Sequence, residues 1–223
     1  MGNLRSVGKA LEKAGASVQV TDSPRAIREA QGVVLPGVGS FDVAAQRLAK
    51  SGLAKAATQA LEKNKPFLGI CLGLQLLFER SDEGKPAKGL GFWKGTVRKF
   101  PAKKNLKVPH MGWNTLLTPS PAVRRERVGE RAKAVPSSQP SPALQRHKML
   151  QGVTEKDYFY FVHSFYPVPD NRDVIATLTT YGVSFCSSAV EGRVFASQFH
   201  PEKSGAQGQR MLRNFVAQLA ACS

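Results

Sequence analysis

Two short and almost entirely apolar runs, GVVLP (32–36) and KPFLGI (65–70), constrain the fold of this 223-residue chain more than any other feature. A strand whose residues are nearly all apolar is buried on both faces, as in a parallel sheet covered by helices. Between the two runs, residues 40–63 show a helical pattern with a break at Gly52. Strands that alternate with helices predict an α/β fold with a largely parallel central sheet and flanking helices.

The second half of the chain follows a different pattern, because its candidate strands lie close together without helices between them. Such spacing favours antiparallel pairing, so we expect this half to be more antiparallel than the first. The predicted strands are GFWKGTVRKF (91–100), YFYFVHSFYPV (158–168), DVIATLTTYG (173–182), SFCSSAVEG (184–192) and RVFASQFHP (193–201).

The remaining elements are predicted near the two ends of the chain and after the second apolar run. Apolar residues at helical spacing predict helices, and alternation predicts a short strand. These elements are a helix over 4–14 with Asn3 as its N-cap, a strand SVQVT (17–21), a helix from Leu72 to about Arg80, and a helix over 205–220.

The chain is long enough to bury a sizeable core as one domain spanning residues 1–223. Segment 118–148 has five prolines and little apolar periodicity, which predicts a disordered surface insertion. Its seven Lys and Arg against two Glu supply part of the formal net charge of +16. No aromatic residue interleaves these basic ones, so there is no stacking platform for bases, and we do not expect a nucleic-acid partner.

Cysteine use and hydropathy indicate a compartment. The three cysteines are an odd and sparse set, which argues against a disulfide framework and for reducing surroundings. No stretch approaches the roughly 18 apolar residues of a membrane span, and the first residues lack the apolar core of a secretory signal. We therefore expect a cytoplasmic protein without a membrane partner.

The stretch PFLGICLGLQLLFER (66–80) places Cys71 between Gly69 and Gly73, where a strand runs directly into a helix. A buried thiol that only packs is one interpretation. The other is a nucleophile, because a sharp strand-to-helix turn exposes the sulfur and admits only small neighbours. The sequence elsewhere has to decide between them.

A candidate base lies late in the chain, in SQFHPEKS (197–204). On an extended segment, residues two apart point the same way, so His200 and Glu202 are expected to share a face. A carboxylate beside an imidazole fixes its tautomer, and the imidazole can then take a proton from a thiol. Cys71, His200 and Glu202 are thus candidate nucleophile, base and orienting carboxylate.

Acyl transfer also needs donors for the oxyanion. The run LPGVGSF (35–41) ends a buried strand with two glycines around Val38, a turn that can direct a backbone N–H toward a site. The N–H of Leu72 can supply a second donor. His110 and His163 have no spacing that joins them to other ligands, so no metal site is predicted.

In this order, PGVG, GICLGLQLLFE, VPHMGWN, YFYFVHSFY and FHPEKSG resemble the class I glutamine amidotransferases. Within that family, MGNLRSV, VPHMGWN and HPEKSG are most similar to the glutaminase subunits of imidazole glycerol phosphate synthases. The resemblance implies that the chain hydrolyses glutamine through a cysteine thioester, without a cofactor. It also implies a heterodimer that passes ammonia to a (β/α)8 cyclase, which makes imidazole glycerol phosphate and AICAR in histidine biosynthesis.

The resemblance also implies a role for each matching position. Cys71 is the implied nucleophile, His200 the base and acid, and Glu202 its orienting partner. The implied oxyanion residues are Gly37, Val38, Gly39 and Leu72; the implied glutamine contacts are Gln75, His163, Ser164 and Phe165; the implied contacts with the cyclase are Trp113, Asn114, Tyr160 and Lys203.

The chain departs from the family pattern before MGNLRSV, where the family has an apolar strand ending in Asp-Tyr-Gly. We therefore expect the first strand of the family sheet to be missing and its neighbour to be an exposed edge. Two other functions remain open at this point. One is an amidotransferase for another acceptor, and the other is a catalytically impaired scaffold protein that kept the fold.

Overall fold

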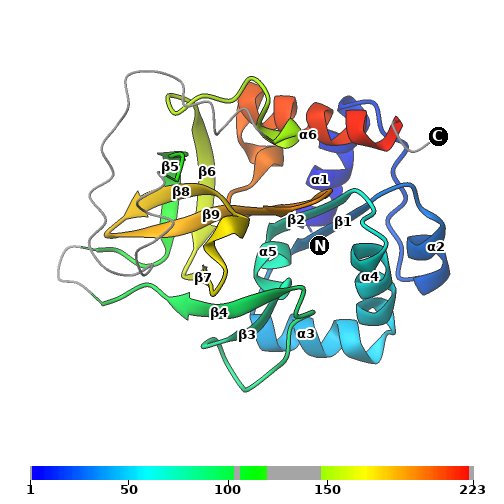
Figure 1. The fold of residues 1–223 in the computed structure, drawn as a ribbon, viewed down its shortest axis with the longest axis horizontal. Coiled ribbons are helices and arrows are strands. Elements are labelled where there is room, and N and C mark those ends of the chain that lie inside the picture. The colour runs from blue at the N-terminus through cyan, green and yellow to red at the C-terminus, as the bar shows by residue number, and fades with distance from the viewer. Residues whose placement is uncertain (1, 103–105, 120–146, 221–223) are drawn as a thin grey trace.

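The structure is a computed structural model that describes residues 2–102, 106–119 and 147–220 (Figure 1). The predicted insertion therefore lies almost wholly outside the described residues. A central five-stranded sheet has the order β1-β2-β10-β9-β8. Its strands are β1 (Val33–Gly37), β2 (Phe67–Cys71), β10 (Val194–Ser197), β9 (Val183–Glu191) and β8 (Ile175–Tyr181).

Strand directions divide this sheet as the sequence predicts. Strands β1, β2 and β10 run parallel, whereas β9 and β8 add antiparallel neighbours. The register places Gly37 beside Cys71 and Ser197 beside Ile70, so the carboxyl ends of the three parallel strands meet at one edge. The candidate nucleophile therefore lies at the edge where open α/β sheets form their sites.

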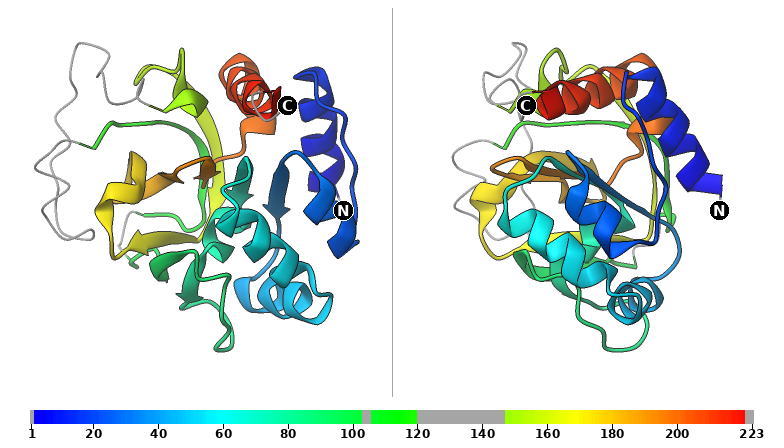
Figure 2. Two further views of the ribbon diagram at one scale, coloured as in Figure 1. Left: turned by 45° about the vertical axis from the view of Figure 1, so that its right-hand side comes forward. Right: turned by 90° about the vertical axis from the view of Figure 1, so that its right-hand side faces the viewer.

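Helices cover both faces of the central sheet (Figure 2). One face packs against α3 (Phe41–Lys50) and α4 (Leu53–Glu62), and the other against α1 (Gly2–Lys13) and α6 (Gly205–Ala220). On β2, Phe67 joins the first cluster and Leu68 the second, and all of this strand except Cys71 is buried. The short α2 (Pro24–Glu29) packs beside α4. The predicted α/β fold is confirmed.

Two smaller sheets complete the structure. Strands β3 (Phe78–Ser81), β4 (Trp93–Lys99) and β7 (Phe165–Pro169) form one, and β5 (His110–Thr115) and β6 (Tyr158–His163) form the other. The predicted strand over 158–168 is therefore two strands, divided at Ser164. Short 3-10 helices lie at Lys148–Leu150, Arg172–Val174 and Pro201–Lys203.

The helix predicted from Leu72 to about Arg80 is wrong beyond its first turn. Helix α5 (Leu72–Leu76) ends after little more than one turn, and the chain continues as β3. The carbonyl of Leu76 accepts the N–H of Leu90, and that of Leu77 accepts the N–H of Trp93. Because a later segment takes the carbonyls that a longer helix would need, the helix stops.

Two predictions near the N-terminus are also wrong. SVQVT (17–21) forms no strand, and Asn3 lies inside α1 rather than before it. Among the described residues, β1 ends the sheet, and the 17–21 segment does not pair with it. A segment of alternating residues forms a strand only where a neighbour supplies the hydrogen-bond ladder, and here the chain stays irregular.

An aromatic cluster joins the central sheet to the β5-β6 pair. Its centre is Phe185 on β9, which is fully buried. The Phe185 ring lies 5.2 to 6.1 Å from five other rings, those of Phe100, His110, Phe161, His163 and Tyr166. This cluster holds the strand that carries His163 against the sheet that carries Cys71.

We expect Phe185→Ala to lower the free energy of unfolding by about 3 to 5 kcal/mol, because it leaves a cavity among these rings. Urea unfolding followed by circular dichroism measures the change. The control is Tyr158→Ala at a side chain that is 55% exposed, where a change within about 0.5 kcal/mol is expected. Equal effects at the two positions would contradict the central place of Phe185.

Candidate active site

Cys71 ends β2 and immediately precedes α5 (Leu72–Leu76). Its backbone has φ 55° and ψ −106°, one of two positive φ values at non-glycine residues of the described chain. Such a conformation costs on the order of 1–3 kcal/mol and persists only where the surroundings enforce it. The sharp turn predicted from the sequence is therefore present, with the cysteine at its strained position.

The two flanking glycines are required by close contacts. A Cβ on Gly73 would collide with the carbonyl oxygen of Leu35 on β1. A Cβ on Gly69 would lie 2.8 Å from the Cβ of Ala196 on β10. The glycines thus let the turn pack directly against the strands on either side of β2.

The candidate base and carboxylate meet as predicted, although not on an extended segment. His200 precedes the 3-10 helix that contains Glu202, and its Nδ1 lies 2.8 Å from Oε1 of Glu202. The two side chains are 3% and 0% exposed. The backbone N–H of His200 donates to the carbonyl of Tyr160 at 2.9 Å, which ties the segment to β6.

Electrostatics around His200 favour its charged form. Burial acts to lower the pKa of this imidazole, but Cys71 and Glu202 outweigh burial and raise that pKa to about 9. Nε2 of His200 is buried and has no hydrogen-bond partner among the described residues. With Nδ1 committed to Glu202, this nitrogen is the one available to exchange a proton with the thiol of Cys71.

The predicted oxyanion residues lie around the same turn. Gly37 ends β1 beside Cys71, and a Cβ on Gly37 would lie 2.9 Å from the Cβ of Leu72. Val38 is 62% exposed, and Gly39 has φ 99°. The turn from Gly37 to Gly39 is therefore an exposed segment whose base is packed tightly against the start of α5.

Two of the predicted glutamine contacts, Gln75 and His163, donate to the backbone carbonyl of a third, Phe165. The carbonyl oxygen of Phe165 accepts Nε2–H of Gln75 at 3.0 Å and Nδ1–H of His163 at 2.8 Å. The carbonyl of Ser164 accepts the backbone N–H of Phe100 at 3.0 Å. These residues lie on α5 and at the junction of β6 and β7, far apart in the sequence, and the fold brings them together.

One polar residue of this group was missed by sequence reasoning. Gln198 is fully buried, and its amide contacts both Gln75 and Cys71. A signal for it existed, because a glutamine directly after an apolar strand and two residues before His200 is unusual for a buried position.

The predicted contacts with a partner lie mainly on the β5-β6 sheet. The rings of Trp113 and Tyr160 are 5.9 Å apart, and Nζ of Lys203 lies 5.7 Å from the centre of the Tyr160 ring. Asn114 donates from Nδ2 to the carbonyl of Thr180. Trp113 is 56% exposed, and the neighbouring Met111, which was not predicted, is 64% exposed.

Cys186, His110 and His163 are buried among other protein groups. Burial strongly raises the pKa of Cys186, whose thiol donates to the carbonyl of Ser188. Cys222 lies outside the described residues. Nδ1 of His110 lies 3.1 Å from Nε2 of His163, and burial lowers the pKa of these rings to about 4 and about 3. Within the described part of the chain, no group of three His, Cys, Asp or Glu could hold a metal ion.

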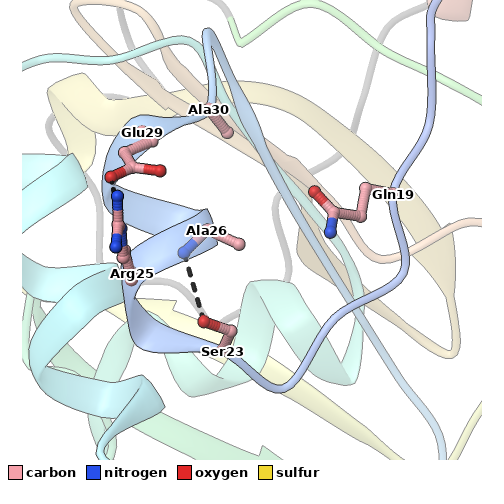
Figure 3. A pocket seen from close by; sticks show the side chains of 6 residues that line it. All are labelled: Gln19, Ser23, Arg25, Ala26, Glu29 and Ala30. Carbon is pink, nitrogen blue, oxygen red and sulfur yellow. Dashed lines mark hydrogen bonds and ion pairs between the residues drawn. The ribbon is translucent and has the colours of Figure 1, made fainter.

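An open cavity of about 380 Å³ lies elsewhere, between α2 and the segment before it (Figure 3). Its lining contains none of the predicted site residues and is formed by Gln19, Ser23, Arg25, Ala26, Glu29 and Ala30. Arg25 and Glu29 form an ion pair at 2.7 Å, and the hydroxyl of Ser23 caps α2. Nothing in this lining resembles catalytic chemistry.

We expect Gly73→Ala to destabilise the chain by at least about 1 to 3 kcal/mol, because the added methyl group meets a backbone atom of β1 that cannot rotate away. Thermal unfolding measures the change. The matched control is Gly8→Ala in α1, where the nearest heavy atom would be 3.8 Å away and a small stabilisation is expected. A Gly73→Ala protein as stable as the control would show that the contact is not tight.

The buried histidine pair predicts sensitivity to acid. In the folded chain His110 and His163 stay neutral to about pH 4 and about pH 3, whereas in the unfolded chain they take up protons near the ordinary pKa of 6.5. Below about pH 6.5 the unfolded state therefore binds more protons, and the free energy of unfolding should fall by up to roughly 1.4 kcal/mol per pH unit for each ring.

Urea unfolding between about pH 7 and about pH 5.5 measures this slope, in a range where most carboxylates stay ionised. The slope should be shallower in His163→Gln, which removes one of the two rings. An unchanged slope in that variant would contradict the assignment of a neutral buried ring to His163.

No helix of the described residues is long and apolar enough to cross a membrane.

Solved structures share the fold at low sequence identity. A glutaminase domain of Trypanosoma brucei CTPS with bound acivicin superposes with a TM-score of 0.64 at 16% identity, over 97% of this chain and 88% of that one. A structure of PurLQS from Thermotoga maritima has a TM-score of 0.63 at 17% identity, over 96% and 91%.

Curated relatives are much more similar in sequence. Proteins named imidazole glycerol phosphate synthase subunit HisH are 42% identical in Synechococcus sp., over 100% of this chain and 91% of the relative, and 43% identical in Geobacillus kaustophilus, over 97% and 92%. Residues 1–219 match the sequence pattern of the family described as "Glutamine amidotransferase class-I". With its turn at Cys71 and its buried His200–Glu202 pair, the chain belongs to the class-I glutamine amidotransferase family.

Proposed function

We propose that the chain is the glutaminase subunit of an imidazole glycerol phosphate synthase. It hydrolyses glutamine to glutamate and ammonia and passes the ammonia to a cyclase partner in histidine biosynthesis. The observation that carries this proposal is the meeting of two distant parts of the chain, in which Cys71 at its strained turn, together with Glu202, raises the pKa of the buried His200. The relatives' name, imidazole glycerol phosphate synthase subunit, supports this choice of acceptor reaction.

The chemistry follows from this geometry. The sulfur of Cys71 attacks the side-chain carbonyl carbon of glutamine, while His200 holds the thiol proton at Nε2. His200 then gives this proton to the departing nitrogen, the C–N bond breaks, and ammonia leaves a glutamyl thioester. Water, deprotonated by His200, cleaves the thioester and restores the thiol.

Two features of the chain assist these steps. The charge that develops on the carbonyl oxygen needs backbone donors, for which we propose the turn of Gly37, Val38 and Gly39 together with the N–H of Leu72. Glu202 stabilises the protonated ring of His200 from the opposite side at 2.8 Å. Gln75, His163, Ser164 and Phe165 are proposed to hold the substrate.

The surface around Trp113 is proposed to receive the cyclase. It combines exposed apolar side chains on β5 with Asn114, Tyr160 and Lys203 nearby. Aromatic and methionine side chains are enriched at protein interfaces, and this surface carries both. A barrel docked there would meet the sheet that continues into His163.

We expect Cys71→Ala to lose glutamine hydrolysis by several orders of magnitude, because no other group can form the thioester. Synthase activity with added ammonium salt should persist in the complex with the cyclase, since the acceptor chemistry belongs to the partner. Glutamate release and product formation are measured side by side, with Cys222→Ala as the thiol control. Glutamine-dependent turnover by Cys71→Ala would rule out the proposed nucleophile.

A further inference from the structure

Gln198 is a buried amide whose two ends contact different parts of the candidate site. It follows β10, and its backbone N–H donates to the carbonyl of Ser187 at 2.8 Å, which fixes the residue in the fold. Its side-chain Nε2 lies 3.6 Å from the sulfur of Cys71, and its Oε1 lies 3.1 Å from Nε2 of Gln75. The proton transfers proposed for Cys71 and His200 do not themselves require this amide.

The surrounding hydrogen bonds determine which end of the amide faces the sulfur. The carbonyl of Phe165 can only accept, so Gln75 must direct its Nε2 toward it. The second N–H of that nitrogen then donates to Gln198, which places the Gln198 oxygen on the Gln75 side. The N–H of Gln198 is consequently the group that faces Cys71.

A donor in this position acts on the charge of the sulfur. An N–H donates more strongly to a thiolate than to a thiol, so it favours the ionised nucleophile. The titratable pair facing the same sulfur is His200 with Glu202 behind it, and the amide adds a neutral donor to that pair. An amide that only filled space could have been satisfied by backbone groups, as Gln218 is by the carbonyl of Asn214.

We propose that Gln198 is a positioning residue for glutamine hydrolysis, whose N–H stabilises negative charge on the sulfur of Cys71 and whose oxygen orients the amide of Gln75. This proposal rests on the proposed function of the chain. It predicts that the two ends of one side chain affect different measurements. Losing the N–H end weakens the nucleophile, and losing the oxygen end loosens the residue proposed to contact the substrate.

The test compares Gln198→Met, which removes both ends at similar length, with Gln198→Glu, which keeps an oxygen for Gln75 and removes the amide N–H. Alkylation of Cys71 by iodoacetamide is followed from about pH 5 to about pH 10, because only the thiolate reacts. Mass spectrometry of the Cys71 peptide separates it from Cys186 and Cys222. The matched control is Gln218→Met, at a buried amide of α6.

We expect the midpoint of the alkylation profile to rise by about one pH unit or more in both Gln198 variants, and most in Gln198→Glu, whose carboxylate repels the thiolate. In the complex with the cyclase, kcat for glutamine should fall between about ten- and a hundredfold in both. The KM should rise in Gln198→Met and stay near the wild-type value in Gln198→Glu. Gln218→Met should leave the alkylation profile unchanged.

Wild-type alkylation midpoints in both Gln198 variants would overturn the proposal, even if the variants were less stable. An equal midpoint shift in Gln218→Met would also overturn it. The shift would then come from a general loss of rigidity and not from the contact between Gln198 and Cys71. Glutamine hydrolysis that survives in Cys71→Ala would instead overturn the proposed function itself. If Cys71→Ala loses hydrolysis while both Gln198 variants keep the wild-type alkylation midpoint, the proposed function stands and the role of Gln198 is rejected.

Discussion

The close packing of the turn at Cys71 against its neighbouring strands is the constraint on which the rest of the site depends. The glycine that follows the cysteine lies against a main-chain carbonyl of β1, and the glycine before it lies against β10. These contacts hold the cysteine in an unfavourable backbone conformation. They also bring the ends of three parallel strands together, and Gln198, which follows β10, contacts the sulfur of Cys71 there.

The sequence alone was sufficient for the parallel half of the sheet and for the sharp turn at Cys71. Strands such as Phe67–Cys71 are apolar on both faces, and a strand of this kind is stable only where both of its faces are covered. The contact between His200 and Glu202 was expected on an extended segment, whereas the structure forms it with Glu202 inside a 3-10 helix that begins directly after His200. In both cases the information was local, within a few neighbouring positions.

The errors arose where distant contacts decide local structure. Helix α5 stops because carbonyls at its end accept donors from residues 90 and 93, which no pattern within 72–80 encodes. SVQVT has a strand-like composition, but no described strand pairs with it. Gln198 was overlooked because its importance comes from Gln75 and Cys71, more than a hundred positions away in the sequence.

The glycine contacts differ in a way that affects how this chain can evolve. Gly37 lies against the side chain of Leu72, and the nearest atom is its Cβ, so a side chain at 37 could be accommodated by a glycine at 72. Gly73 lies against a carbonyl oxygen, and every amino acid carries that atom. No second substitution at Leu35 can therefore make room for a side chain at position 73. Descendants of this sequence can exchange the first glycine through paired changes, whereas the second can be replaced only if the strand itself moves.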